Sequence, residues 1–134
     1  MDPGNASVSP GYRVLVVEDD DNIATALHYV VSREGMACDR VSNGGFALAH
    51  IRATRPDLVL LDVMLPEVSG YDICVAIRTD PAISGTRVLM MTARGSAQEQ
   101  RRALEQGADG FIAKPFDLGK LRGEVWRLLS PPTG

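Results

Sequence analysis

The sequence predicts an α/β protein in which helices cover both faces of a parallel sheet. Four short apolar runs have the length of strands buried on both faces, and they occupy residues 14–17, 58–61, 88–91 and 110–113. A further strand is expected at about residues 37–41. A helical apolar pattern follows each strand, and strands that alternate with helices favour a doubly wound sheet with right-handed crossovers.

Length and composition agree with one ordinary globular domain. The chain has 134 residues, of which 45% are hydrophobic and 23% are charged, enough for a real core. A net charge of -3 and a sequence pI near 5.3 argue against direct binding to nucleic acid. No run is apolar enough to span a membrane, and the first residues lack the pattern of a signal peptide, so we expect a cytoplasmic protein without membrane contact.

The domain boundaries follow from local composition. Residues 1–11 are rich in Pro, Gly and Ser and predict a disordered lead, so the folded domain is expected over residues 12–129. Residues 130–134 read as a tail or the start of a linker. Cys38 and Cys74 have no metal-like or redox-like spacing, so small core residues are the favoured interpretation.

The first three helices have recognisable ends. Asp20 and Asp21 begin the first helix, which Gly35 closes, and Asn43 can cap the second, which cannot continue through Pro56. The third helix is expected over residues 71–79, ending before Asp80-Pro81. The expected core positions of these helices are Ile23, Leu27, Val30, Val31, Ala47, Leu48, Ile51, Ile73 and Ile77.

The last two helices differ in their apolar content. A capping box, Ser96 to Glu99, marks the start of the fourth, which runs to about Gln106. Its only apolar anchors are Ala97, Ala103 and Leu104, so we expect it to be the least firmly held helix. Asp117 caps the last helix, and its expected buried residues are Leu118, Leu121, Val125, Leu128 and Leu129.

Polar residues follow four of the predicted strands. They are Glu18 with Asp19, then Asp62, Thr92 and Lys114. The carboxyl ends of parallel strands share one edge of the sheet, where ligands of such folds bind. Clustered carboxylates repel one another unless a cation lies among them, and oxygen ligands without His or Cys favour Mg²⁺.

These motifs resemble the receiver domain of two-component response regulators. The resemblance is carried by Glu18-Asp19, by the run from Asp62 to Pro66 with Gly70, by Thr92-Ala93, and by Lys114-Pro115-Phe116, and it covers roughly residues 12–129. It implies a flavodoxin-like fold of five strand and helix pairs, with strand order 2-1-3-4-5. Each motif alone is weak, but their order and context together are specific.

The resemblance also implies a chemistry. Asp62 would accept a phosphoryl group from the phosphohistidine of a sensor histidine kinase, while Thr92 and Lys114, before a commonly cis proline bond, would contact phosphoryl oxygens. Mg²⁺, or Mn²⁺ as a substitute, would be bound by Asp19, Asp62 and the backbone carbonyl of Met64, with Glu18 acting largely through water. The chain would then be a signalling phosphoacceptor, and an enzyme only in assisting its own phosphorylation and slow dephosphorylation.

By the same resemblance, Thr92 and Phe111 would form a switch that transmits phosphorylation. We expect the responding face to comprise the helix at 96–106, the strand at 110–113 and the last helix, which would contact a downstream effector. Met64 and Arg94 lie two residues after Asp62 and Thr92, where they would tune the lifetime of the phosphoryl group; an apolar Met and a cationic Arg predict slow self-dephosphorylation.

Several alternatives stay open at this stage. The chain could be a pseudo-receiver that signals without phosphorylation, or a Mg²⁺-dependent aspartyl-phosphate hydrolase, although hydrolases usually carry a second Asp where Met64 stands. It could be a stand-alone receiver, or a piece cut before an effector with Pro131-Pro132 as the linker start.

Asp109 fits a symmetric dimer contact, but the last helix lacks the other charges for it, so homodimerisation is undecided. The kinase and the stimulus are also undecided. His28 and His50 lie away from the acidic edge and read as solvated or capping residues.

Overall fold

A five-stranded parallel sheet forms the centre of the molecule, which we describe from a computed structural model covering residues 11–93 and 95–130. The strand order is β2-β1-β3-β4-β5, so the predicted doubly wound fold and its order are confirmed. Nearly all of the predicted lead and tail lies outside the described residues. The strands are β1 (Arg13–Val17), β2 (Ala37–Val41), β3 (Leu58–Asp62), β4 (Arg87–Thr92) and β5 (Gly110–Ala113).

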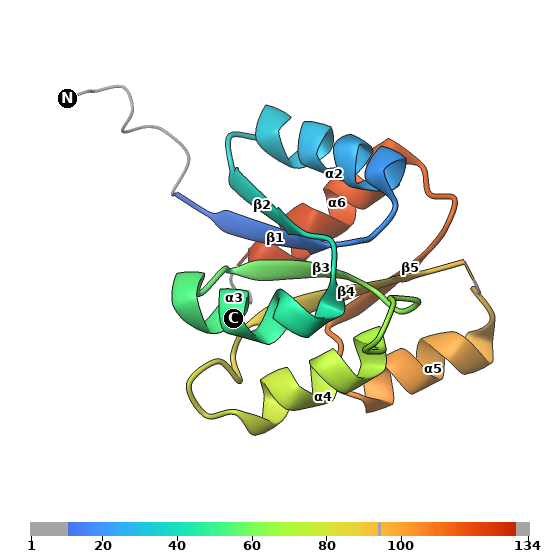
Figure 1. The fold of residues 1–134 in the computed structure, drawn as a ribbon. Coiled ribbons are helices and arrows are strands. Elements are labelled where there is room, and N and C mark those ends of the chain that lie inside the picture. The colour runs from blue at the N-terminus through green and yellow to red at the C-terminus, as the bar shows by residue number, and fades with distance from the viewer. Residues whose placement is uncertain (1–10, 94, 131–134) are drawn as a thin grey trace.

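The helices form one layer on each face of the sheet (Figure 1). One face is covered by α2 (Asp21–Arg33) and α6 (Leu118–Leu129). The other is covered by η1 (Gly44–Phe46), α3 (Ala47–Thr54), α4 (Gly70–Thr79) and α5 (Ala97–Glu105). Two hydrophobic clusters, one on each face, fill the spaces between these layers and the sheet.

Side-chain caps fix where the helices begin. The carboxylates of Asp20 and Asp117 accept hydrogen bonds from the first backbone N–H groups of α2 and α6, and the Ser96 hydroxyl does so for α5. Asn43 caps the short turn η1, through which the chain enters α3. The caps predicted at Ser96 and Asp117 are confirmed. Asp20 is the N-cap residue of α2 and not part of its first turn, and Asn43 caps η1, whereas α3 itself has no side-chain cap. The helices thus begin at the carboxyl edge of the sheet.

The central strands are buried on both faces, as their continuous apolar runs predict. Every residue of β3 is buried, and so are the last four residues of β1 and the last five of β4. Each fully buried Leu, Ile or Val contributes about 1.5–3 kcal/mol relative to an exposed position. The rigid core thus ends at the same level in three neighbouring strands, and the polar residues that follow are held there.

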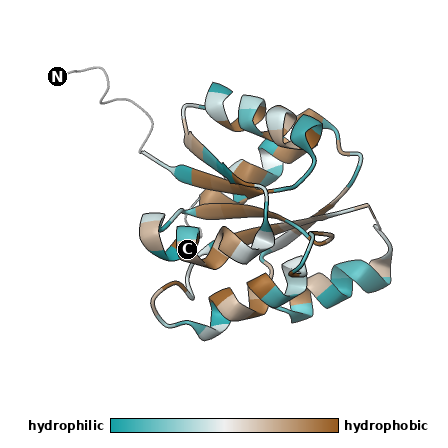
Figure 2. Ribbon diagram, viewed as in Figure 1, coloured by the Kyte–Doolittle hydropathy of each residue, from teal (hydrophilic) through white to brown (hydrophobic). Residues whose placement is uncertain are grey.

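Three residues predicted to be buried or to anchor a helix are exposed instead, namely Leu118, Leu104 and Ala97. Leu118 is 43% exposed because it lies in the first turn of α6, where it lines cavities between α2 and α6 and does not reach the sheet. Leu104 is 47% exposed, and Ala103 is the one buried residue among those described in α5. Figure 2 shows α5 as mostly hydrophilic. The expectation that α5 is the most weakly anchored helix is therefore reinforced.

The cysteine and histidine side chains and Trp126 lie in packed or hydrogen-bonded positions away from the carboxyl edge. Cys74 is fully buried and Cys38 is partly buried, and both thiols are free. Trp126 packs edge-on against Tyr12, with 6.1 Å between the ring centroids. His28 lies beside Ser32 on α2, and His50 lies 3.3 Å from the Asp39 carboxylate. No helix of the described ranges has the length and apolar character needed to cross a membrane.

Candidate functional site

The carboxyl edge of the sheet holds all the buried polar residues of the described chain. Glu18 follows β1, Asp62 ends β3 and Thr92 ends β4, with exposed fractions of 0%, 3% and 1%. Burial of charged groups is costly unless they are paired or hydrogen-bonded. Their concentration at one edge therefore points to a function, and the predicted convergence of these strand ends is confirmed.

Lys114 supplies the positive charge that these acids require. Its Nζ lies 2.8 Å from Glu18 Oε1 and 3.1 Å from Asp62 Oδ2. The ammonium group thus bridges the carboxylates of two residues that lie 44 positions apart in the sequence, at the ends of different strands. The Lys114-Pro115 peptide bond is cis, as the resemblance implied, and the Lys114 backbone N–H donates to the Thr92 carbonyl at 2.7 Å.

Burial and pairing act in opposite directions on the pKa values of this pair. Burial raises the pKa of Glu18 above its usual range, although the Lys114 hydrogen bond opposes the rise. Burial alone lowers the pKa of Lys114, but its hydrogen bond to Glu18 and the Asp62 charge outweigh that effect and raise it. Lys114 therefore remains a cation at neutral pH. Burial disfavours the charged form of Glu18 more strongly, because Glu18 is the more deeply buried of the two.

Backbone N–H groups orient the second oxygen of each buried carboxylate. The Asp20 N–H donates to Glu18 Oε2 at 3.1 Å, and the Met64 N–H donates to Asp62 Oδ1 at 3.1 Å. Each carboxylate is thus held on one oxygen by Lys114 and on the other by the loop that follows its own strand. The two acids have fixed directions before any ligand binds.

The loop between β3 and α4 is tight because Gly70 lies against the end of β3. A Cβ atom on Gly70 would lie 2.2 Å from the Asp62 carbonyl oxygen, closer than any real contact. The Gly70 N–H donates to the Val63 carbonyl at 3.0 Å, and the Ser69 hydroxyl caps α4. Only glycine fits here, so the shaped loop that Pro66 and Gly70 predicted is confirmed.

Asp19 completes a set of acids that can hold a metal ion. One oxygen from each of Glu18, Asp19 and Asp62 lies within 4.8 Å of the others. Magnesium binds oxygen at about 2.1 Å, so opposite ligands are about 4 Å apart and a small contraction or a bridging water suffices. The residues present therefore fit a hard divalent cation, with Asp19 exposed on the solvent side.

Other predicted site residues surround this centre. The Met64 side chain is 60% exposed and lines a cavity of about 440 Å³ together with Thr92. Phe111 is partly buried and packs against the cluster beneath α4 and α5. Arg94, to which the sequence assigned a role in phosphoryl lifetime, lies outside the described residues.

Sequence reasoning missed a contact between α4 and α5 beside the site. The Tyr71 hydroxyl donates to Glu99 Oε1 at 2.6 Å, and the Arg102 guanidinium lies 4.2 Å from the centre of the Tyr71 ring. Burial and the Glu99 hydrogen bond raise the pKa of Tyr71 to about 12. The predicted capping box is thus made through Ser96, while the Glu99 carboxylate binds Tyr71. The only signal in the sequence is an aromatic residue directly after Gly70.

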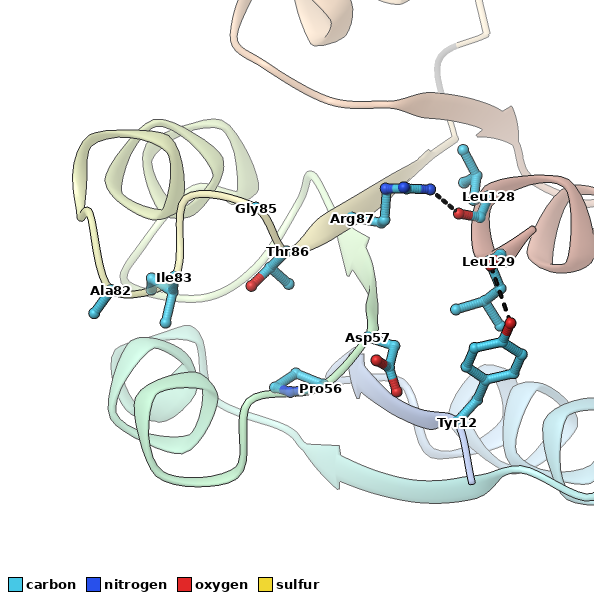
Figure 3. A pocket seen from close by; sticks show the side chains of 10 residues that line it. All are labelled: Tyr12, Pro56, Asp57, Ala82, Ile83, Gly85, Thr86, Arg87, Leu128 and Leu129. Carbon is cyan, nitrogen blue, oxygen red and sulfur yellow. Dashed lines mark hydrogen bonds between the residues drawn. The ribbon is translucent and has the colours of Figure 1, made fainter. Parts of the chain in front are cut away.

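A second cavity, of about 330 Å³, lies at the opposite, amino edge of the sheet (Figure 3). Its polar side chains fasten backbone groups: Arg87 donates to the Leu128 carbonyl and Tyr12 to the Leu129 carbonyl. Nearby, Asp109 pairs with Arg78 at 2.6 Å within the same molecule. The suggested role of Asp109 in a dimer contact stays a prediction.

Comparison with known proteins agrees with this geometry. The model of the family described as response regulator receiver domain matches residues 14–125. The DNA-binding response regulator MtrA of Mycolicibacterium smegmatis is 42% identical over 113 residues, which are 84% of this chain and 48% of MtrA. The phosphate regulon transcriptional regulatory protein PhoB of Rhizobium meliloti is 36% identical over 117 residues, 87% of this chain and 52% of PhoB.

Solved structures share this fold. The chemotaxis response regulator CheY4 of Vibrio cholerae superposes with a TM-score of 0.84 at 27% identity, over 89% of this chain and 99% of that one. The chain therefore spans about half the length of the curated relatives that it matches, but nearly the whole of a single-domain structural neighbour.

Proposed function

Because the chain belongs to the family of response regulator receiver domains, we propose that it accepts a phosphoryl group on Asp62 from a phosphohistidine of a sensor histidine kinase. The observation that carries this proposal is the state of Asp62: it is 3% exposed, paired with Lys114 at 3.1 Å and flanked by Glu18 and Asp19. A buried carboxylate held in a fixed direction beside a cation is suited to act as a nucleophile.

In the proposed reaction, an Asp62 carboxylate oxygen forms a bond to phosphorus as the bond from phosphorus to the donor imidazole nitrogen breaks. The electron pair of that bond goes to the imidazole, and the product is an acyl phosphate. Lys114 offsets charge on one phosphoryl oxygen and the Thr92 hydroxyl donates to another, because such reactions depend mostly on positioning and electrostatics. Glu18, Asp19, Asp62 and the Met64 carbonyl would hold Mg²⁺, or Mn²⁺ in its place, which would supply further positive charge.

We assign the output to the face formed by α5, β5 and α6. Thr92 would move toward a phosphoryl oxygen and Phe111 would turn inward, governed by packing alone since it has no hydroxyl group. α5 is weakly anchored, since Ala103 is the one buried residue among those described in it. This supports the choice because loosely held elements rearrange at low cost. Slower amide exchange on this face after beryllofluoride binding is expected; exchange that slows nowhere on this face contradicts the assignment.

The lifetime of the phosphoryl group is expected to be long. Met64 cannot orient an attacking water, and Arg94 can pair with the phosphoryl charge. We expect faster decay of phospho-Asp62 in Met64→Asn and Arg94→Ala, followed by intact mass after removal of the phosphoryl donor. Decay rates equal to those of the wild type contradict the tuning role.

Two alternatives are less well supported. A phosphorylation-independent pseudo-receiver would not need Glu18, Asp62, Thr92 and Lys114 assembled and buried at one edge. An aspartyl-phosphate hydrolase usually places a second Asp where Met64 stands. The proposed role is therefore signalling rather than turnover, in the cytoplasm, with a kinase and a downstream effector as partners, no direct contact of this domain with nucleic acid or membrane, and homodimerisation open.

The function is tested by labelling with acetyl phosphate. We expect a mass increase of one phosphoryl group in the presence of Mg²⁺, none in Asp62→Asn, and normal labelling in Asp57→Asn, which changes an exposed acid at the amino edge. Absence of labelling when EDTA is added before the reaction would identify the metal requirement. Equal labelling of Asp62→Asn and wild type would overturn the proposal, and no labelling of any form would favour the pseudo-receiver.

A further inference from the structure

Arg40 holds the backbone from which the acids of the site project. It lies on the edge strand β2, opposite Val16 of β1. Its Nε and one terminal nitrogen both donate to the Glu18 carbonyl oxygen, at 3.0 and 2.8 Å. Its other terminal nitrogen lies 2.7 Å from Asp21 Oδ1, and the side chain is 29% exposed.

The two hydrogen bonds from Arg40 fix the position of the peptide group between Glu18 and Asp19. The Glu18 N–H donates to the Val41 carbonyl at 3.1 Å, so β2 holds both backbone polar groups of Glu18, one through its main chain and one through Arg40. A peptide unit is planar, and fixing its carbonyl fixes the direction in which the next residue leaves. The direction of the Asp19 side chain is therefore set from β2.

Asp19 depends on this support more than its neighbours do. Glu18 and Asp62 are held on both carboxylate oxygens by Lys114 and by backbone N–H groups. Within the described ranges, no hydrogen bond or ion pair to the Asp19 carboxylate is present. Its position relative to the other two acids, which all lie within 4.8 Å of one another, thus comes from the backbone alone.

We propose that Arg40 is a positioning residue for the divalent-cation site, acting through the Glu18 carbonyl to aim the Asp19 carboxylate. This inference rests on the proposed function, since it requires that the wild-type protein bind Mg²⁺. Charge and position have opposite effects on binding, which makes the two roles separable. As a mere positive charge near the acids, Arg40 weakens the attraction of a cation; as a positioning group, it strengthens binding.

The test measures Mg²⁺ affinity directly by isothermal titration calorimetry of the purified protein. We expect Arg40→Gln to weaken Mg²⁺ binding about tenfold, the scale on which outer partners of metal ligands act. Arg40→Lys should also weaken binding, because an ammonium keeps the charge but loses the two-nitrogen grip. Asp21→Asn removes the ion pair and leaves both hydrogen bonds to the carbonyl in place, so its affinity should stay within about twofold of the wild type.

A control separates positioning from stability. Arg78 also donates to backbone carbonyls, those of Gly107, Ser84 and Thr86, but at the amino edge. Arg78→Gln should lower the melting temperature without changing Mg²⁺ affinity. In Arg40→Gln the rate of labelling by acetyl phosphate should recover toward the wild-type value at saturating Mg²⁺, because the nucleophile and Lys114 are untouched.

The results of these measurements distinguish a failure of the positioning role from a failure of the proposed function. Unchanged or tighter Mg²⁺ binding by both Arg40 variants, with binding by the wild type, overturns the positioning role and leaves the proposed function intact. Absence of Mg²⁺ binding by the wild type overturns the proposed function itself. If Arg40→Gln fails to fold, the affinity of Arg40→Lys decides between the outcomes.

Discussion

The two edges of the sheet differ in how their charged and polar side chains are arranged. At the amino edge they fasten the backbone: Asp57 accepts from the Arg13 N–H at 2.8 Å, Tyr12 donates to the Leu129 carbonyl, and Arg87 donates to the Leu128 carbonyl. At the carboxyl edge, Glu18 and Asp62 are buried side by side and depend on one ammonium group. The first arrangement stabilises the fold, whereas the second keeps two carboxylates buried where a bound cation can neutralise them.

This contrast explains why the chemistry is expected at one edge only. Helices begin at the carboxyl edge, so the backbone N–H groups of their first turns and the buried acids meet there. At the amino edge the helices end, and the last carbonyls of α6 accept hydrogen bonds from the Arg87 and Tyr12 side chains (Figure 3). Paired substitutions at the two edges test the comparison.

The largest difference is expected between two glycines. Gly70→Ala places a Cβ atom against the Asp62 backbone, which cannot move because β3 is buried, and should lower the free energy of unfolding by about 3 kcal/mol. Gly85→Ala at the amino edge meets no atom within 4 Å and should stay within about 1 kcal/mol of the wild type. Chemical denaturation measures both; similar losses would contradict the close approach at Gly70.

Removal of the shared cation should have the next largest effect. Lys114→Met leaves Glu18 and Asp62 without their charged partner and should cost about 2 kcal/mol in metal-free buffer. Added Mg²⁺ should stabilise this variant more than it stabilises the wild type, since the ion no longer competes with the ammonium group.

The matched change at the amino edge is Arg87→Met. It removes a hydrogen bond to one carbonyl and should cost about 1 kcal/mol, equally with and without Mg²⁺. Thermal melts of both variants over a series of Mg²⁺ concentrations provide the comparison. An Mg²⁺ response that is the same in Lys114→Met as in the wild type would show that the ammonium and the metal do not share the same acids.

A smaller effect on stability is expected when the hydroxyl group of Tyr71 or of Tyr12 is removed. Tyr71→Phe removes the 2.6 Å bond to Glu99 and should loosen α5, with a cost of about 1 kcal/mol and faster amide exchange over residues 97–105. Tyr12→Phe removes a 3.2 Å bond to a neutral carbonyl and should cost about 0.5 kcal/mol. Hydrogen exchange read by mass spectrometry locates each change; unaltered exchange in α5 would remove Tyr71 as its anchor.

The smallest expected effect is a dependence of stability on alkaline pH. Burial and the Glu99 hydrogen bond raise the pKa of Tyr71 from 10.0 to about 12, so between these values the folded protein keeps a proton that the unfolded chain releases. Unfolding is therefore favoured as the pH rises through this window. The denaturation midpoint of the wild type should fall more steeply between pH 10 and pH 12 than that of Tyr71→Phe; parallel profiles would refute the shift.

Much of the fold was predictable because its signals are local. The apolar runs of β1, β3 and β4, and caps such as Ser96 and Asp117, depend on neighbours in sequence and were placed correctly. The expected burial of Leu118, Leu104 and Ala97 was wrong because helical spacing gives the direction of a side chain and not whether a neighbour lies opposite. The same limit hid the pairing of Glu99 with Tyr71, which joins two helices 28 residues apart.

The sequence alone determined which strands form, where each ends, and that an acid, a hydroxyl or an amine follows four of those ends, because hydrophobic pattern and turn chemistry are read over a few residues. Only the tertiary structure decided that Lys114 bridges Glu18 to Asp62 and that Arg40 grips the Glu18 carbonyl. Those contacts depend on strand order, register and the depth of burial, all of which arise when distant segments pack together.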